Sequence, residues 1–121
     1  MNFFYDNCFK KAESNTYYRD TIFTTDHSQL VLMSLKPGET IPREKHNGDQ
    51  IFIIVAGEGE ASIDQKTVAL KEHGTLIVPA NVEHEIRNTS NTPLKFFTVY
   101  TPPQHPAETR HETAADDEEH A

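Results

Sequence analysis

Residues 42–59, PREKHNGDQIFIIVAGEG, join a charged segment to an apolar strand through a tight turn. The turn at residues 47–49 (Asn-Gly-Asp) has the composition of a three-residue hairpin loop, in which the glycine supplies a positive φ. Such a loop predicts that His46 and Gln50 lie beside each other across two paired strands. Glu44 lies two residues before His46 and therefore shares its face. The stretch thus predicts that a carboxylate, an imidazole and an amide oxygen gather on one face.

The rest of the chain is divided into short runs that are rich in β-branched and aromatic residues. Gly, Pro, Asn and Asp separate the runs at short intervals, which predicts an all-β sandwich or barrel. The expected strands are Thr21–Thr25, Gln29–Leu35, Gln50–Ala56, Ala61–Asp64, Thr67–Leu70, Thr75–Val78, Glu83–Asn88 and Lys95–Thr101. We expect an N-terminal extension at residues 1–20, the barrel at residues 21–101 and a Pro-containing acidic tail at residues 102–121.

Two of the expected strands are apolar on both faces. In residues 29–35 and in residues 50–56, apolar side chains occupy successive positions rather than alternate ones. A strand with one solvated face alternates apolar and polar residues, so both faces of these strands must be covered. The cover is either a second sheet of the same chain or a partner subunit, and in so small a chain we expect a homodimer.

The composition excludes several classes of protein. A chain of 121 residues forms one domain. Its net charge is −8, and because residues 108–121 hold six acids against one base, the rest is only mildly acidic. No basic stripe is present, so nucleic-acid binding is not expected. No apolar run is long enough to span a membrane and no signal peptide is recognisable, which predicts a cytoplasmic location. Cys8 is the only cysteine, which excludes an internal disulfide and a cysteine-based zinc site.

A second histidine-bearing segment lies downstream, at VPANVEHEIRN. After a turn at residues 79–81, His84, Ile86 and Asn88 share one face of an expected strand. If this face is the inner one, His84 enters an apolar interior and needs a partner, because a buried unpaired imidazole is costly. Either a metal ion or a hydrogen bond would satisfy it.

The spacing Gly38-x5-Glu44-x-His46-x3-Gln50-x6-Gly57 resembles the first of the two motifs of the cupins, which are small β-barrels of jelly-roll type. The family pattern is G-x5-H-x-H-x3,4-E-x6-G, and every spacing in it is met. The resemblance implies a cupin jelly-roll barrel over most of the chain.

The second cupin motif, G-x5-P-x-G-x2-H-x3-N, is matched by Pro79, His84 and Asn88. Asn81 stands in place of the second glycine, and His73 stands where the first is expected. Asn tolerates a left-handed backbone better than most residues, so its presence is a mild departure from the pattern.

In cupins, the histidines and the glutamate of these motifs bind a divalent transition metal inside the barrel. The resemblance therefore implies metal ligands at Glu44, His46, Gln50 and His84. Glu44 stands in place of a family histidine and Gln50 in place of the family glutamate, so the carboxylate has changed position and the net charge of the ligand set is unchanged. Two histidines and one carboxylate also form the facial triad of non-haem Fe(II) enzymes. The sequence leaves open whether the ion is manganese, iron, zinc or nickel. A metal-free barrel in which these side chains bond one another is the alternative.

Three functions are compatible with this resemblance. Small single-domain cupins of this kind resemble those called mannose-6-phosphate-isomerase-like, which implies a metal-dependent enzyme acting on a small sugar-like or carbonyl substrate. An Fe(II)-type dioxygenase and a non-catalytic small-molecule-binding or regulatory cupin are the alternatives. An isomerase needs a separate base, and a phosphorylated substrate needs a cationic anchor. The sequence assigns neither role, since Arg87 is expected to point outward, and the catalytic residues are unknown.

The tail after Tyr100 has three prolines in six residues and ends in acidic residues with almost no apolar surface. We expect its end to be flexible and disordered, whereas residues 102–111 have the option of lying along the barrel. The tail histidines His105 and His111 are expected to be solvated, and metal binding or capping of the barrel mouth is the alternative.

Overall fold

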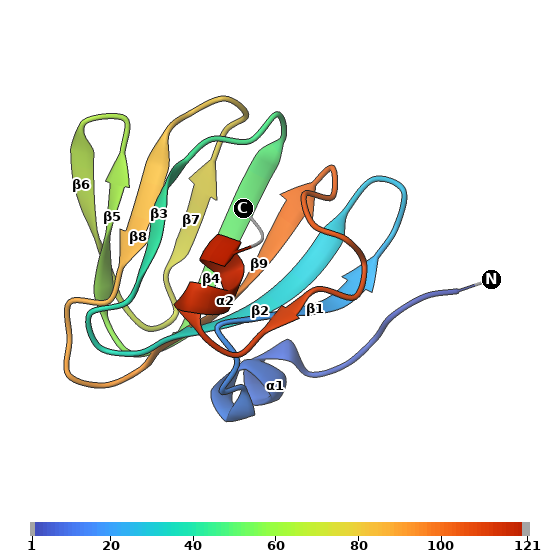
Figure 1. Cartoon of the computed structure of the whole chain (residues 1–121), viewed down its shortest axis with the longest axis horizontal. Helices are drawn as coiled ribbons and strands as arrows, with labels where there is room; N and C mark the ends of the chain where they lie inside the picture. The colour runs from blue at the N-terminus through green and yellow to red at the C-terminus, as the bar shows by residue number, and fades with distance from the viewer. Residues whose placement is uncertain (1, 120–121) are drawn as a thin grey trace.

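The computed structural model describes residues 2–119 as two antiparallel sheets that pack face to face (Figure 1). The strands are β1 (Arg19–Thr24), β2 (Gln29–Leu35), β3 (Thr40–Glu44), β4 (Asp49–Ala56), β5 (Gly59–Ile63), β6 (Lys66–Leu70), β7 (Thr75–Val78), β8 (His84–Arg87), β9 (Leu94–Thr101) and β10 (Arg110–His111), and the helices are α1 (Cys8–Ser14) and α2 (Ala114–Glu119). One sheet has the order β10-β1-β2-β9-β4-β7 and the other the order β3-β8-β5-β6. None of the helices in the described part of the chain is long and apolar enough to cross a membrane.

The all-β prediction is confirmed, and the expected strands correspond to β1, β2 and β4 to β9. The sequence reading missed β3, which contains Pro42 and mainly polar residues. Proline is tolerated there because β3 is an edge strand that pairs only with β8, and its register shifts between Ile41 and Glu44. An edge strand of this composition carries no apolar alternation that would identify it.

The predicted hairpin at residues 47–49 is wrong. The strands on its two sides belong to different sheets, since β3 pairs with β8 whereas β4 pairs with β7 and β9. The segment between them is therefore a crossing from one sheet to the other. Gly48 is not among the residues with positive φ. It is required because a Cβ at this position would overlap the Thr101 carbonyl oxygen.

The space between the sheets holds the main core. The inward face of β9 is buried along its whole length, while its alternate residues are only half-buried. Phe96 and Tyr100 therefore point into the core, and Phe97 points outward. The other large members of the core are Tyr18, Val31, Met33, Leu35, Ile41, Phe52, Ile54 and Ile86.

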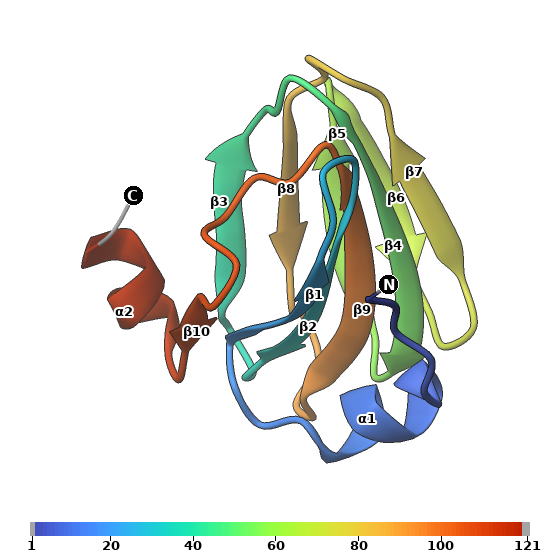
Figure 2. The ribbon, with the colours of Figure 1, turned by 90° about the vertical axis from the view of Figure 1, so that its right-hand side faces the viewer.

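The outer face of the six-stranded sheet is covered in part by α1, which lies against β2, β4 and β9 (Figure 2). Ala12 of this helix is fully buried against Leu32 and Val55, and its small side chain allows the helix to approach closely. Phe9 packs edge-on against Phe97, with ring centroids 5.4 Å apart. One face of β2 and β4 is thus covered by the opposite sheet, and the other is covered in part by the N-terminal segment, a source of cover that the sequence reading did not consider.

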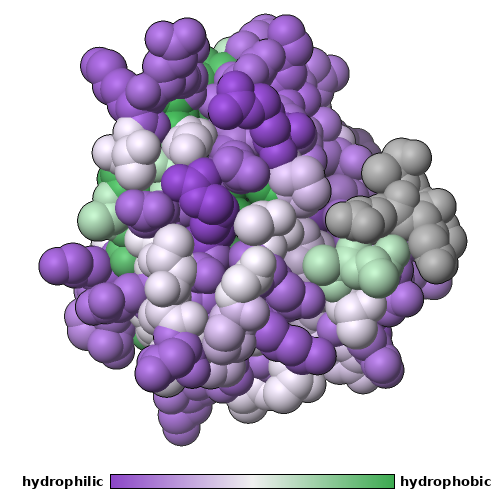
Figure 3. Space-filling view, turned by 60° about the vertical axis from the view of Figure 1, so that its left-hand side comes forward, coloured by the Kyte–Doolittle hydropathy of each residue, from purple (hydrophilic) through white to green (hydrophobic). Residues whose placement is uncertain are grey.

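The outer face of the four-stranded sheet is polar. Arg87 on β8 bonds Ser62, Glu85 and Glu60, which confirms that it points outward. The side that holds β6, β5 and β8 is mainly hydrophilic when it is turned forward (Figure 3). Lys95 bonds the backbone oxygen of Glu13, so neither basic residue points into the interior.

After β9 the tail runs along the body and returns to the edge of the larger sheet, where β10 pairs with β1. The fully buried Gln29 holds it there: its amide nitrogen donates to the His105 carbonyl, and its amide oxygen accepts from the backbone nitrogens of Gln104 and His105. Beyond β10, helix α2 lies in front of the gap between the sheets (Figure 1). Residues 102–111 thus lie along the barrel, which was the alternative to a disordered tail. Flexibility of the acidic end stays a prediction, and part of it concerns residues 120–121, which lie outside the described range.

Candidate metal centre

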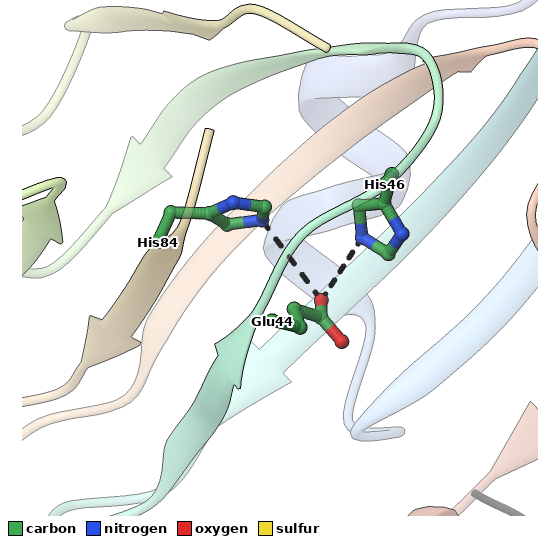
Figure 4. A group of neighbouring side chains, drawn as sticks. All are labelled: Glu44, His46 and His84. Atoms are coloured by element: carbon green, nitrogen blue, oxygen red, sulfur yellow. Dashed lines mark hydrogen bonds and ion pairs between the residues drawn. The ribbon is translucent and has the colours of Figure 1, made fainter. Parts of the chain in front are cut away.

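Four side chains converge where the two sheets meet at one end of the core. Glu44 ends β3, His46 lies in the crossing segment, His84 begins β8 and Gln50 lies near the start of β4. Glu44 and His84 are direct partners in the β3–β8 register, and the crossing segment returns His46 to the same place (Figure 4). The sequence therefore predicted the grouping correctly, although the hairpin from which it was derived does not exist.

The ligand atoms of three of these residues form a compact cluster. The Oε1 atom of Glu44 lies 3.1 Å from His46 Nε2 and 4.0 Å from His84 Nε2. All three atoms lie within 4.8 Å of one another, which is the spacing that one ion can bridge. Gln50 adds a fourth atom from the other sheet, since its Oε1 lies 3.1 Å from His84 Nε2.

The orientation of Gln50 follows from its neighbours. Thr98 Oγ1 donates to the Ile51 carbonyl at 2.8 Å and therefore accepts from the Gln50 amide nitrogen at 3.1 Å. The amide oxygen of Gln50 must then face His84. Gln50 is buried, as is Thr98, so this orientation is fixed by the core.

The tautomer of His84 follows in the same way. Its Nδ1 lies 3.0 Å from the Val82 carbonyl, which can only accept, so Nδ1 carries the proton and Nε2 of a neutral ring carries a lone pair. That lone pair faces the Gln50 oxygen and the Glu44 carboxylate, so acceptors meet acceptors inside the protein. A cation between them, either a proton or a metal ion, resolves this arrangement, and an imidazole oriented through its other nitrogen is typical of metal ligands. The residues present fit a metal ion.

Charge in the cluster comes from Glu44. Burial alone would raise the pKa of this carboxyl, but the hydrogen bond and charge of His46, together with the charge of Arg19, hold it below its usual value. The carboxylate is therefore ionised near neutral pH. Two imidazole nitrogens, one carboxylate and one amide oxygen suit a divalent transition metal.

Two departures from the second cupin motif are explained by the backbone. His73 has φ of +74° and Asn81 has φ of +67°, and both occupy positions where the pattern has glycine. The turn geometry that glycine supplies is thus kept without glycine. Asn81 also donates its backbone N–H to the His46 carbonyl at 2.7 Å, which ties the crossing segment to the turn before His84.

A cavity of about 390 Å³ opens beside Glu44, and most of its lining was missed by sequence reasoning. The lining residues are Arg19, Glu44, His105, Pro106, Thr109, His111 and Asp117. Arg19 was overlooked because it stands in the segment expected to be an extension, and no local pattern shows that a charged residue there points inward. Only contacts far along the chain, with Tyr100 and the tail, place it.

The expectation that the tail histidines are solvated is wrong. The Nε2 atom of His105 accepts from Arg19 Nη1 at 2.9 Å, and the ring lies edge-on to Tyr100. His111 is partly buried, and its Nδ1 lies 2.8 Å from Asp117 Oδ1. Both histidines thus belong to the wall of the cavity.

The buried contact of His105 makes stability depend on pH. Burial and then the charge of Arg19 lower the pKa of His105 to about 4, whereas in an unfolded chain it lies near 6.5. The contribution of neutral His105 is complete above pH 6.5 and is lost as the pH falls from about 6.5 to about 4. We expect the free energy of unfolding to fall over this range by about 1–2 kcal/mol more in the native protein than in His105→Asn.

Urea denaturation followed by circular dichroism at half-unit steps of pH measures this difference. The matched control is His27→Asn, which changes an exposed turn histidine and should keep the native slope. Equal slopes in His105→Asn and the native protein would contradict the prediction.

Comparison with known proteins agrees with the fold. The family model described as Cupin domain matches residues 31–100. The uncharacterized protein YrkC of Bacillus subtilis is 38% identical over 117 residues, which cover 91% of this chain and 63% of that protein. The oxalate-binding protein of Thermotoga maritima is 35% identical over 68 residues, which cover 55% of this chain and 56% of that protein. The chain therefore spans less than two thirds of the length of each of these curated relatives.

Solved structures give the same result over more of the chain. The crystal structure of BH2720 from Bacillus halodurans superposes with a TM-score of 0.93 at 33% identity, covering 96% of this chain and 93% of that one. An RmlC-like cupin with a double-stranded β-helix fold from Methanocaldococcus jannaschii superposes with a TM-score of 0.68 at 31% identity, covering 74% of this chain and 84% of that one. With a family model that matches more than half of its length and a fold that these structures share, the chain belongs to the cupin family.

Proposed function

We propose that this cupin holds a divalent manganese, iron, zinc or nickel ion on Glu44, His46 and His84, with the amide oxygen of Gln50 as a fourth ligand, and that it acts as a metal-dependent enzyme on a small carbonyl-containing substrate. The observation that carries the proposal is the convergence of acceptor atoms, in which the lone pair of His84 Nε2 faces two oxygens. When bound, the ion would polarise a substrate carbonyl or enediolate oxygen as a Lewis acid.

The chain's own part in such a reaction is to hold and shield the substrate. The cavity beside Glu44 has room for a small molecule and leads to the cluster from the tail side. The ring of Tyr100 lies edge-on to the rings of His46 and His105, with centroids 5.3 and 5.2 Å away, and so joins the cluster to the wall of the cavity. A substrate in this cavity would meet the cluster from the side on which Glu44 lies.

The isomerase version has a direct test. Mannose 6-phosphate is incubated with the protein and either Mn²⁺ or Zn²⁺, and the formation of fructose 6-phosphate is followed. Turnover that is lost in His46→Ala supports the proposal, because His46 would be a ligand of the ion. Activity that survives this substitution, or turnover that needs no added metal in stripped protein, would overturn it.

An Fe(II)-type dioxygenase is the second candidate, favoured by the donor set of two histidines and one carboxylate. It predicts consumption of O₂ that depends on Fe(II) and on a small organic substrate, measured with an oxygen electrode. A panel of small aromatic, thiol and keto-acid substrates without uptake would remove this candidate.

A non-catalytic small-molecule-binding or regulatory role is the remaining alternative. It is favoured by the similarity to a protein whose name describes oxalate binding. Binding of oxalate to the metal-loaded protein, measured by calorimetry, together with no turnover in either assay above would support this role.

We also propose that the chain forms a homodimer through the outer face of the larger sheet. Ile77 on the edge strand β7 is 60% exposed and pairs with Ile51 of β4, and α1 covers only part of this face. We expect sedimentation at micromolar concentration to give a species of twice 13.7 kDa. Ile77→Lys should shift it to the monomer, whereas Val68→Lys on the other sheet, also exposed, should not. A native protein that sediments only as monomer would contradict the proposal.

A further inference from the structure

The feature that calls for an explanation is a buried arginine next to the metal cluster. Arg19 is 1% exposed and lines the same cavity as Glu44. Its Nη1 donates to Tyr100 Oη at 3.0 Å and to His105 Nε2 at 2.9 Å, so one side of the guanidinium bonds neutral groups, one on β9 and one in the anchored part of the tail. The positive charge of Arg19 is neutralised by another residue.

The other edge of the guanidinium faces Asp117 of α2. Arg19 Nε donates to Asp117 Oδ1 at 2.7 Å, and Nη2 donates to Oδ2 at 3.3 Å. This is the two-pronged geometry in which arginine binds a free carboxylate. Asp117 thus sits on Arg19 as the carboxylate of a small acid would.

The segment that carries Asp117 is short. α2 has six residues, too few for a helix that is stable by itself in water. Ala114 packs partly buried on the main core, and Asp117 also bonds His111. The firm attachment of the tail lies earlier, at Gln29, in β10 and at Glu112, whose carbonyl accepts from the backbone N–H of Tyr18 at 3.2 Å. The part after Glu112 can therefore move without loss of that attachment.

Only an anion can exchange with Asp117. A guanidinium buried as deeply as Arg19 is strongly destabilised when its charge is left without a partner, so a neutral molecule cannot displace the carboxylate. A ligand carboxylate restores both hydrogen bonds and occupies the same edge. Because Glu44 lines the same cavity, the remainder of such a ligand has room to extend toward Glu44, the carboxylate of the cluster.

We propose that the cavity between Arg19 and the Glu44–His46–His84 cluster binds a small carboxylic acid, whose carboxylate takes the place of Asp117 on Arg19 while the segment from residue 113 to residue 119 moves aside. The class that fits is a hydroxy or oxo acid of a few carbons, since an oxygen next to the carboxylate would then face the cluster. The assignment to hydroxy or oxo acids rests on the proposed metal function, whereas the exchange of carboxylates at Arg19 does not.

The test is a binding titration with the metal-stripped 121-residue protein. Glycolate and pyruvate are the probes, measured by calorimetry, and glycolamide is the neutral control. We expect Asp117→Asn to bind both acids about tenfold or more tightly than the native protein, because the internal competitor is gone and the competent fraction rises. Glu112→Gln removes one exposed tail charge outside the cavity and should leave the affinity unchanged. Glycolamide should bind to none of them.

Two further measurements test the carboxylate exchange at Arg19. Arg19→Gln should lose binding of the acids, and circular dichroism shows whether it is folded. In the native protein, saturating glycolate should move the backbone amide resonances of residues 113–119 toward random-coil positions. The exchange is overturned if Asp117→Asn binds the acids no more tightly than the native protein, which is the result expected of an ion pair that only stabilises the fold. Equal tightening for inorganic phosphate would overturn the assignment to carboxylates.

The proposed metal function is tested by a measurement that is independent of acid binding. Metal content is measured on the untreated protein, and tighter acid binding by stripped Asp117→Asn does not depend on it. A protein without metal that still shows the tightening keeps the acid site and loses the proposed chemistry.

Discussion

The combined substitution of Glu44→Ala and His46→Ala is expected to remove the bound metal, with a loss of affinity of about 100-fold or more. The two changes delete the only carboxylate of the cluster and one of its two imidazoles. The remaining His84 Nε2 and Gln50 Oε1 are neutral donors and hold a divalent ion weakly. Elemental analysis of protein purified without a histidine tag, followed by competition with a chelating dye, measures the loss.

The matched control for this substitution is Glu72→Ala with His73→Ala. These residues have the same chemistry and lie 3.7 Å apart, but their side chains are 62% and 79% exposed and lie outside the cluster. The control should retain the native metal content. Equal metal content in both double variants would mean that the ion is bound elsewhere.

Gly48→Ala is expected to lower the free energy of unfolding by about 3 kcal/mol. A Cβ at Gly48 would overlap the carbonyl oxygen of Thr101 and Cδ of Pro102, which are backbone and ring atoms rather than a movable side chain. Thr101 cannot give way, because it pairs with Asp49 in the β4–β9 ladder. The strain falls on the segment that carries His46, so metal affinity should decline together with stability.

Urea denaturation followed by circular dichroism gives the stability, and Gly38→Ala is the comparison. Gly38 has φ of +84° but open space around its Cβ position, so its substitution costs about 1 kcal/mol of backbone strain. A smaller loss for Gly48→Ala than for Gly38→Ala would show that the close approach of the two segments does not constrain the fold.

Much of the fold could be predicted because strands with strong apolar patterns can be recognised from the sequence alone. The eight such strands are present in the structure, and the motif spacing from Gly38 to Gly57 implied the correct family. The four predicted ligand positions meet in space for the reason that the resemblance supplied, and their role as ligands stays a prediction. The motif spacing predicts this grouping because, in a fold of two packed sheets, residues at these sequence positions lie at the same places in the barrel.

The hairpin was mispredicted because alternation cannot show which sheet a strand joins. Residues 47–49 have the composition of a tight turn, yet the backbone there passes between sheets, and Pro42 confines β3 to an edge. The pairing is decided by β8 and β9, which lie more than thirty residues further along the chain. Local sequence contains no signal for a partner at that distance.

The cavity was missed for a similar reason. Arg19 and Asp117 are 98 residues apart in the chain, and each by itself resembles an ordinary charged surface residue. An acidic, proline-containing tail has the composition of a disordered segment, yet the buried side chains of Arg19 and Gln29 and the pairing of β10 with β1 hold it in place. Contacts that depend on a single buried partner leave no periodic pattern to read.

The central claim is that Glu44, His46 and His84 hold a metal ion, and anomalous X-ray scattering from crystals of untagged protein tests it most directly. Data collected on both sides of the absorption edge of the metal found by elemental analysis should give one strong peak among Glu44 Oε1, His46 Nε2 and His84 Nε2, with Gln50 Oε1 beside it. Stoichiometric metal with no peak at this position, or a well-ordered cluster whose atoms bond one another with no peak in crystals grown with excess metal, would contradict the account.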